Sequence, residues 1–344
     1  MSPTLIVGMG AVGGVVAAGL LRAGEAPVLA TGRADLQRRI ASDGLIIADE
    51  TGEAVVRARA IVDAGELDAS VHFEAIILAT KAADTVGIAA ELRTRLAPGG
   101  YFLTLQNGYI IDAVASVVGG DANVIGGVTG FTAMTTEPAV YRRTSRGALY
   151  VGEVDGTETQ RVAALAERLA CVAPTHVSGN ISGALWSKLC LNCSITALAG
   201  VTGLPLASLL DSSLGRRVFL SALHEVVRTA ALKHVRLEPL AVPPEMLIVD
   251  PAPGWLHSEK TERLLNSLIA GYGHGKPSVL RSLEQHRKTE IDYLTGYVSR
   301  TAGDLGVPAR LNQAITELIH EIEDDELEIS PENLARLAPL CADG

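Results

Sequence analysis

The sequence predicts an α/β fold class for the first half of the chain, with a doubly wound parallel sheet, followed by an all-α second domain. Three observations support this prediction. The first half alternates between β-like and helical patterns, which is the order that a doubly wound sheet requires. A glycine-rich segment joins the first strand to the first helix. After about residue 178, β-branched runs disappear, apolar residues recur at helical spacing, and prolines mark the interruptions.

The elements of the first half follow one another in a regular order. The predicted strands are Leu5–Val7, Pro27–Thr31, Ala75–Thr80, Tyr101–Leu105 and Asn123–Val128. The helices predicted between them are Val15–Arg22, Leu36–Ser42, Asp84–Leu96 and Ile110–Val117. Two hairpins are also expected, one formed by Leu45–Ala48 and Ala54–Ala60 around a Thr51-Gly52 turn, and one within Ala139–Glu153.

The change of pattern places the domain boundary near Ser178. Residues 1–178 are predicted to form the nucleotide-binding domain, and residues 179–344 the helical domain that binds substrate and carries the catalytic groups. The first helix of the second domain is expected to start near Asn180 or Ser182 as its cap and to lie along the cleft between the domains. A chain of 344 residues is long enough for two such cores.

Composition restricts the partner and the compartment. The net charge of −10 argues against nucleic acid and anionic membrane, which bind basic surfaces, and favours a small molecule. Four unevenly spaced cysteines fit reduced thiols in a cytoplasmic protein. The apolar run Thr4–Leu21 contains five glycines with no Lys or Arg before it, and no other segment is expected to span a membrane. An apolar helical domain could pack alone or in a homodimer, so the oligomeric state stays open.

The segment that follows the first strand has the pattern GxGxxG. Gly8 permits a tight turn, Gly10 lets the backbone approach a pyrophosphate, and Gly13 lets the helix pack close to the strand. The pattern alone is weak in a chain with 35 glycines, but it occurs once, between a strand-like and a helix-like segment. We therefore expect a nucleotide to bind at the segment consisting of Gly8, Met9, Gly10, Ala11, Val12 and Gly13.

Polar residues follow three further strands, at the edge of the sheet where open α/β proteins bind ligands. Arg33 follows the second strand, Lys81 the third and Asn107 the fourth. An Arg at the position of Arg33 favours the 2′-phosphate of NADP, whereas the nearby Asp35 leaves NAD open. Each of these residues has a simpler interpretation, as an exposed charge for Arg33 and Lys81 and as a turn former for Asn107.

In the second half, one helical stretch carries a row of polar residues. Lys188, Asn192 and Thr196 are spaced i, i+4 and i+8 and should share one face. A lysine beside apolar residues loses its proton more easily than in water, which suits a general acid near neutral pH. Cys190 and Cys193 lie in the same stretch and are expected to be two packed thiols, and no metal site is predicted from the sequence. The acidic run Glu321–Glu328 is typical of a solvated helix end.

With these residues in view, the chain resembles the ketopantoate reductase (2-dehydropantoate 2-reductase) family over nearly its full length. The matching stretches, in order, are Gly8–Gly14, Ala79–Lys81, Leu105–Gly108, Trp186–Leu189 with Asn192, Lys288–Leu294 and Gly306–Pro308. The resemblance implies an N-terminal NADP-binding Rossmann domain, a helical C-terminal domain, and NADPH and a 2-oxo acid as cofactor and substrate.

The resemblance also assigns roles by position. It makes Lys188 the general acid, Asn107 a residue at the nicotinamide and the substrate carboxylate, and Lys81 a cofactor contact. The residues that would hold the substrate by resemblance are Asn192, Ser278 and Glu290, and Glu290 is also expected to be catalytic. Thr196, on the same helix face as Asn192, is expected to contact the substrate as well. An ammonium at Lys188 would stabilise and protonate the alkoxide that hydride transfer creates. By composition alone, Glu290 would be an exposed helix charge and Ser278 a helix cap.

Two departures bear on the substrate. Thr196 stands where the family usually has a second Asn, and Ser282 where it usually has Asp. The sequence therefore indicates an NADPH-dependent reductase of a small 2-oxo acid, with ketopantoate in pantothenate biosynthesis as the leading substrate. The alternatives are a reductase of a different 2-oxo acid, a 3-hydroxyacid dehydrogenase, and a non-catalytic NADP-binding protein.

Overall fold

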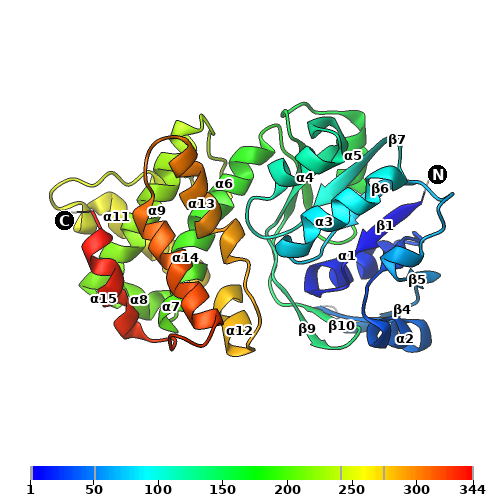
Figure 1. The fold of residues 1–344 in the computed structure, drawn as a ribbon, viewed down its shortest axis with the longest axis horizontal. Coiled ribbons are helices and arrows are strands. Elements are labelled where there is room, and N and C mark those ends of the chain that lie inside the picture. Colours follow the sequence, from blue (N-terminus) through cyan, green and yellow to red (C-terminus); the bar gives the residue numbers. More distant parts are fainter. Residues whose placement is uncertain (1–2, 50–51, 241, 274–275, 343–344) are drawn as a thin grey trace. The chain divides into compact units, whose positions relative to one another are not determined.

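The computed structural model describes residues 3–49, 52–240, 242–273 and 276–342. The chain divides into two compact units (Figure 1). Unit 1 comprises residues 1–106 and 110–182, and unit 2 comprises residues 107–109 and 183–344. The second division therefore falls between Ser182 and Gly183, and a three-residue loop from the first half of the sequence belongs to the second unit.

Unit 1 is built on an eight-stranded sheet in the order β12-β11-β8-β7-β6-β1-β2-β5. Six neighbouring strands of this sheet run parallel, in the order β5-β2-β1-β6-β7-β8. The next strand, β11, is antiparallel to β8. This is the strand order of a Rossmann fold, and it confirms the predicted doubly wound sheet. The strands are β1 (Thr4–Val7), β2 (Val28–Ala30), β5 (Ala60–Val62), β6 (Phe73–Leu78), β7 (Leu96–Thr104), β8 (Val124–Thr129), β11 (Leu149–Glu153) and β12 (Thr175–Val177).

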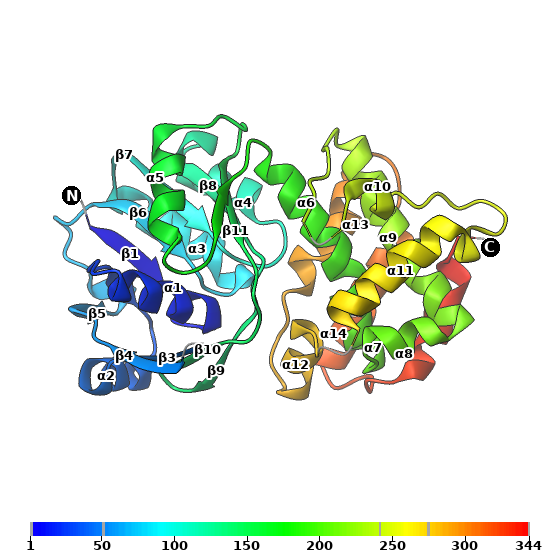
Figure 2. The same ribbon diagram turned by 180° about the vertical axis from the view of Figure 1, so that it is seen from behind.

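Helices cover both faces of this sheet, as crossover connections between parallel strands require. Figure 1 shows α3 (Ala82–Leu92) and α4 (Ile111–Val118) on one face. Figure 2 shows α1 (Ala11–Arg22) and α5 (Gln160–Leu169) on the other. The helix α2 (Ala34–Asp43) follows β2. The strands between these layers are apolar and buried, as in β1, where all four residues are buried.

A second, four-stranded sheet has the order β4-β3-β10-β9. Its strands are β3 (Leu45–Asp49), β4 (Gly52–Val56), β9 (Ala133–Glu137) and β10 (Val140–Arg143). The antiparallel pair of β3 and β4 confirms the first predicted hairpin, although Thr51 of its turn lies outside the described residues. The end of that hairpin was wrong, because Ala60 belongs to β5 of the main sheet. The second predicted hairpin was also wrong, since β10 pairs with β3 and β9 whereas β11 pairs with β8 and β12.

Unit 2 is helical, and none of its described residues lies in a strand, as the sequence predicts. Its first helix, α6 (Ile181–Leu191), continues through a π-helical turn at Asn192–Thr196 into α7 (Ala197–Thr202). The remaining helices are α8 (Leu206–Asp211), α9 (Ser213–Leu232), α10 (Pro244–Leu247), α11 (Glu259–Tyr272), α12 (Ser278–Glu284), α13 (Thr295–Asp304), α14 (Arg310–Glu323) and α15 (Leu334–Leu337).

The continuous helix Ile181–Thr202 has the length and hydropathy of a membrane span, with a mean hydropathy of 1.3. The expectation that no segment after the N-terminal run is apolar enough to span was therefore wrong on composition. However, 83% of this apolar window is buried inside the protein. The core helix of a globular unit passes the same test, because it too is apolar on nearly every side.

Candidate active site

The glycine loop between β1 and α1 has the backbone that its sequence predicts. Gly8 has a φ of +96°, and a Cβ there would lie 2.6 Å from the backbone nitrogen of Thr80. A Cβ at Gly13 would lie 1.9 Å from the carbonyl oxygen of Gly8. A side chain at either position would therefore overlap the protein backbone, so only glycine fits there. The glycines at these two positions let α1 start directly above the end of β1.

Gly10 differs from its two neighbours in the motif, because it is exposed and has an ordinary φ of −81°. Among the described residues, no heavy atom lies within 4 Å of a Cβ built on Gly10, and no side chain caps α1. The bare start of a helix with open space beside it suits an anionic group, because the first-turn amides and the helix dipole both favour negative charge. The loop therefore fits the pyrophosphate of a dinucleotide.

Tyr141 supports the glycine loop, and no pattern in the sequence pointed to this residue. Its side chain is fully buried, and its hydroxyl donates a hydrogen bond of 3.1 Å to the carbonyl oxygen of Met9. A Cβ on Gly14 would lie 2.3 Å from the Tyr141 ring, so the fourth glycine of the segment makes room for the tyrosine. Burial raises the pKa of the phenol, whereas the charge of Arg33 lowers it. Burial is the larger effect, so the pKa of Tyr141 is raised and its hydroxyl stays protonated as a hydrogen-bond donor.

Arg33 is the cap position immediately before α2, and it lies shortly after the end of β2. Its guanidinium Nη2 lies 2.7 Å from Asp35 Oδ2, and both side chains are more than half exposed. The hydrogen bond from Arg33 lowers the pKa of Asp35. An exposed arginine at this strand end can bind a phosphate, but here it shares its charge with a carboxylate.

Lys81 and Gln106 lie at the ends of the neighbouring strands. Lys81 is exposed and starts α3. Gln106 is buried, and its amide donates a hydrogen bond of 3.3 Å to the carbonyl of Thr80, which ties the end of β7 to the end of β6. Because β7, β6, β1 and β2 are parallel neighbours, the glycine loop, Arg33, Lys81 and Gln106 follow their strands at one edge of the sheet.

Asn107 follows the same edge in sequence, but its loop packs within unit 2. Gly108 has a φ of +88°, and a Cβ there would lie 2.4 Å from the carbonyl oxygen of Tyr293. The next amide, of Tyr109, donates a hydrogen bond of 3.0 Å to that same oxygen. The Tyr109 ring stacks on Tyr297 with centroids 4.8 Å apart. Asn107 is thus held by the unit that also contains Lys188 and Glu290.

Lys188, Asn192 and Thr196 form a single accessible row on their helix. Within residues 183–202 they are the partly exposed positions, and every other residue in that range is buried. The spacing of these residues predicts a regular α-helix from Lys188 to Thr196, whereas Asn192–Thr196 forms a π turn. Four residues span slightly more than one α turn but less than one π turn, so the π turn brings Thr196 back toward the line of Lys188.

The amine of Lys188 lies in surroundings that disfavour its charge. Burial lowers its pKa from the usual 10.5 to about 8, while the carboxylate of Glu290 acts in the opposite direction. Glu290 is half-buried at the start of the short helix Ile291–Tyr293. The Lys188 amine and the Glu290 carboxylate therefore interact electrostatically, although about a hundred residues separate them in the sequence. A lysine in this condition can exchange a proton near neutral pH.

Ser278 and Ser282 are one turn apart on α12, which packs against α7 and the π turn. The helix contacts α7 through Val279, since a Cβ on Gly200 would lie 2.5 Å from Val279 Cγ1. Ser278 is exposed and Ser282 half-buried. The two hydroxyls therefore belong to the same group of helices as Asn192 and Thr196.

The two cysteines on the Lys188 helix are fully buried and unpaired, which confirms the interpretation as packed thiols. Burial raises the pKa of Cys190 to about 12, so its thiol stays protonated at neutral pH. Among the residues that the structure describes, no cluster of three or more His, Cys, Asp or Glu side chains could hold a metal ion.

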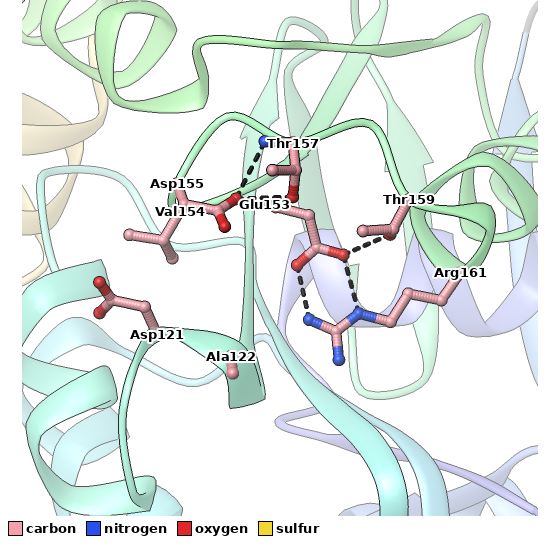
Figure 3. A pocket seen from close by; sticks show the side chains of 8 residues that line it. All are labelled: Asp121, Ala122, Glu153, Val154, Asp155, Thr157, Thr159 and Arg161. Atoms are coloured by element: carbon pink, nitrogen blue, oxygen red, sulfur yellow. Dashed lines mark hydrogen bonds and ion pairs between the residues drawn. The ribbon is translucent and has the colours of Figure 1, made fainter.

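A hollow of about 410 Å³ in unit 1 lies away from these residues (Figure 3). It is lined at the start of β8 by Asp121 and at the end of β11 by Glu153, and thus lies at the opposite edge of the sheet from the glycine loop. The Glu153 carboxylate accepts hydrogen bonds from Arg161 Nε at 2.8 Å, from Arg161 Nη2 at 2.6 Å and from Thr159 at 2.5 Å. The ion pair between Glu153 and Arg161 therefore joins the end of β11 to α5 and has a structural role.

Comparisons with known proteins identify the family of this chain. The family model described as "Ketopantoate reductase PanE/ApbA" matches residues 4–156, and the model of its C-terminal domain matches residues 180–323. The chain belongs to the ketopantoate reductase family. The predicted family is thereby confirmed, and with it the class of oxidoreductase enzymes.

Individual members of the ketopantoate reductase family are similar over nearly their whole length. The 2-dehydropantoate 2-reductase of Halobacterium salinarum is 26% identical over 325 residues, which cover 93% of this chain and 99% of the relative. The crystal structure of a PanE/ApbA family ketopantoate reductase from Ralstonia eutropha is 25% identical, with a TM-score of 0.78 over 94% of this chain and 99% of the other. A D-mandelate dehydrogenase solved with NADH and anilino(oxo)acetate is 23% identical, with a TM-score of 0.79 and the same coverage, and so shows a shared fold.

Proposed function

We propose that this ketopantoate reductase family member reduces a small 2-oxo acid with NADPH, and that its substrate is 2-dehydropantoate, which gives pantoate in cytoplasmic pantothenate biosynthesis. The observation that carries the proposal is the half-buried Lys188, whose pKa is about 8 and whose charge interacts with Glu290. A lysine with this pKa is mostly protonated at neutral pH and still gives up its proton readily.

The residues of unit 1 supply the cofactor side of the proposal. The open space at Gly10 and the bare start of α1 would receive the pyrophosphate, and Arg33 would bind the 2′-phosphate of NADPH. Lys81, at the end of the next strand, would add a second positive charge near the phosphates. The bound nicotinamide supplies the hydride that the reduction requires.

The residues of unit 2 supply the substrate side. As a carbonyl carbon is reduced, its oxygen becomes an alkoxide, which the Lys188 ammonium would stabilise and protonate. Asn107, Asn192, Thr196 and Ser278 would bind the carboxylate and neighbouring polar groups of the substrate, and Glu290 would accept from its hydroxyl. This set of donors around one acid–base lysine matches the chemistry of a 2-oxo acid.

A second candidate is a 2-oxo acid with a bulky apolar substituent. Thr196 and Ser282 are short, and they replace the amide and carboxylate that the family usually has, so less polar contact is available to a hydroxylated substrate. A structurally similar D-mandelate dehydrogenase acts on an aryl-substituted acid, as its name states.

The test measures the rate of NADPH oxidation by the purified protein with three kinds of substrate: ketopantoate, branched 2-oxo acids that lack its hydroxyl group, and an aryl 2-oxo acid. Each measurement is repeated with NADH. We expect turnover to be fastest with ketopantoate and NADPH. Lys188→Ala should lose turnover while its NADPH affinity, measured by cofactor fluorescence, stays unchanged. Preference for the aryl acid would establish the second candidate, and undiminished turnover in Lys188→Ala would refute the role of the lysine.

A further inference from the structure

Glu323, at the end of α14, is a buried carboxylate that the sequence did not distinguish from its acidic neighbours. Its side chain is 3% exposed, compared with 39% for Glu321 and 58% for Asp324. The expectation that the acidic run is a solvated helix end was therefore wrong at this one position. A carboxylate is costly to bury unless it is paired and hydrogen-bonded, so its partners indicate its role.

The partners of Glu323 lie on the segment that carries Glu290. Glu323 Oε1 accepts a hydrogen bond of 2.6 Å from the backbone amide of Thr289, the residue directly before Glu290. Its other oxygen lies 3.5 Å from the ammonium of Lys288. The carboxylate thus holds both the backbone and a side chain on the N-terminal side of Glu290.

His320, one turn earlier on α14, holds the other side of Glu290. Its Nε2 lies 3.1 Å from Asp292 Oδ1, and its Nδ1 lies 3.4 Å from Glu323 Oε2. The imidazole therefore lies between the two carboxylates. Arg300 adds a further hydrogen bond of 2.6 Å to the carbonyl of Asp292. Glu290 is bracketed by residues that α13 and α14 fix on both sides.

The same segment also fixes the loop of Asn107. The amide of Tyr293 donates to the carbonyl of Glu290 at 2.9 Å, and the carbonyl of Tyr293 in turn accepts from Tyr109 at 3.0 Å. A displacement of residues 289–293 would therefore move Glu290 relative to Lys188 and loosen Asn107 together.

We propose that Glu323 and His320 are positioning residues that hold the segment Thr289–Tyr293 so that Glu290 faces Lys188. The proposal rests on the proposed function for the roles of Glu290 and Lys188. Neither Glu323 nor His320 needs to touch the substrate, because both act through the backbone and side chains that flank Glu290.

The experiment compares Glu323→Ala, Glu323→Gln and His320→Gln with a matched control, Glu321→Ala. Glu321 lies on the same helix, but it is partly exposed and its carboxylate is paired with Arg336 instead. Glu323→Gln keeps an acceptor for the Thr289 amide and removes the charge, so it should restore part of what Glu323→Ala loses. It also keeps the test valid if Glu323→Ala does not fold.

Two measurements separate the outcomes. Amide hydrogen exchange of a peptide covering residues 286–294, on substrate-free protein, should speed up in Glu323→Ala and in His320→Gln, and not in Glu321→Ala. With the oxo acid that the wild type reduces, Glu323→Ala should raise KM about 10- to 100-fold, while the NADPH affinity stays within about twofold.

A folded Glu323→Ala protein with wild-type exchange in this peptide and a wild-type KM would overturn the proposal. So would equal effects in Glu321→Ala, because they would indicate a general loss of stability in α14. Failure of the proposed function would look different, since the wild type itself would then reduce no oxo acid while the exchange measurement would still decide whether Glu323 and His320 hold the segment.

Discussion

Replacing Glu290 with Gln should shift the pH dependence of the reaction by changing the pKa of Lys188. The amine has a pKa of about 8, which is lowered by burial and raised by the Glu290 carboxylate. Glu290→Gln removes the contribution that raises it and leaves the burial. Because an opposite charge nearby typically changes a pKa by about 1–3, the pKa of Lys188 in the variant should fall to roughly 7 or below.

The sign follows from the role of the lysine as an acid. Reduction needs protonated Lys188, so the rate is full below the pKa and falls as the pH rises through it. In the wild type, about a tenth of the lysine stays protonated one pH unit above the pKa, so kcat should drop about tenfold between pH 7 and pH 9. In Glu290→Gln the same decline should begin about one pH unit lower.

The assay is the rate of NADPH oxidation at saturating oxo acid over this pH range, with Glu284→Gln as the control. Glu284 belongs to the same unit and is paired with Lys276 at the surface, so its loss removes an equal charge away from Lys188. A wild-type rate that stays constant up to pH 10 would contradict the lowered pKa. An unshifted profile in Glu290→Gln would contradict the electrostatic link between the two residues.

Three further predictions follow from the same geometry. Lys188→Met should raise the free energy of unfolding at pH 7 by about 1–3 kcal/mol after allowance for partial exposure, because the folded state otherwise pays to keep the ammonium buried. The folded pKa is depressed, so the wild type gains stability as the pH rises from about 8 toward 10.5, and the advantage of the variant in denaturant titrations should shrink over that interval. Arg33→Ala should weaken NADPH binding roughly 10- to 100-fold and have little effect on NADH binding, as measured by fluorescence titration. Asp35→Asn should strengthen NADPH binding, because it frees the Arg33 guanidinium from its ion pair. Equal losses for both cofactors in Arg33→Ala would contradict binding of the 2′-phosphate by Arg33. Gly13→Ala should destabilise unit 1 by about 1–3 kcal/mol, because its Cβ would overlap the Gly8 carbonyl. Gly10→Ala should keep the melting temperature of the wild type and lose NADPH affinity, because the space beside Gly10 is open. An unchanged NADPH affinity in Gly10→Ala would contradict pyrophosphate binding at that position.

The parts of the fold that sequence predicted well are those specified by local chemistry. Five of the eight strands of the Rossmann sheet, β1, β2, β6, β7 and β8, are predicted because apolar β-branched runs end at turn-forming or charged residues. The three strands β5, β11 and β12 are not recognised as members of this sheet. The hairpin predicted within Ala139–Glu153 failed because strand pairing is not local. Val140–Arg143 and Leu149–Glu153 are close in sequence, yet each finds its partners in a different sheet.

The sequence by itself determined the glycine loop, the residues at the strand ends and the polar row on the Lys188 helix. Each of these depends on backbone conformation and helical or strand periodicity, which a short stretch of residues specifies. Tertiary structure alone decided that Asn107 packs in the same unit as Lys188, that the π turn realigns Thr196, and that one glutamate of an acidic run is buried behind Glu290. These features depend on which distant side chains share a low-dielectric environment, and that is fixed only when the chain has packed.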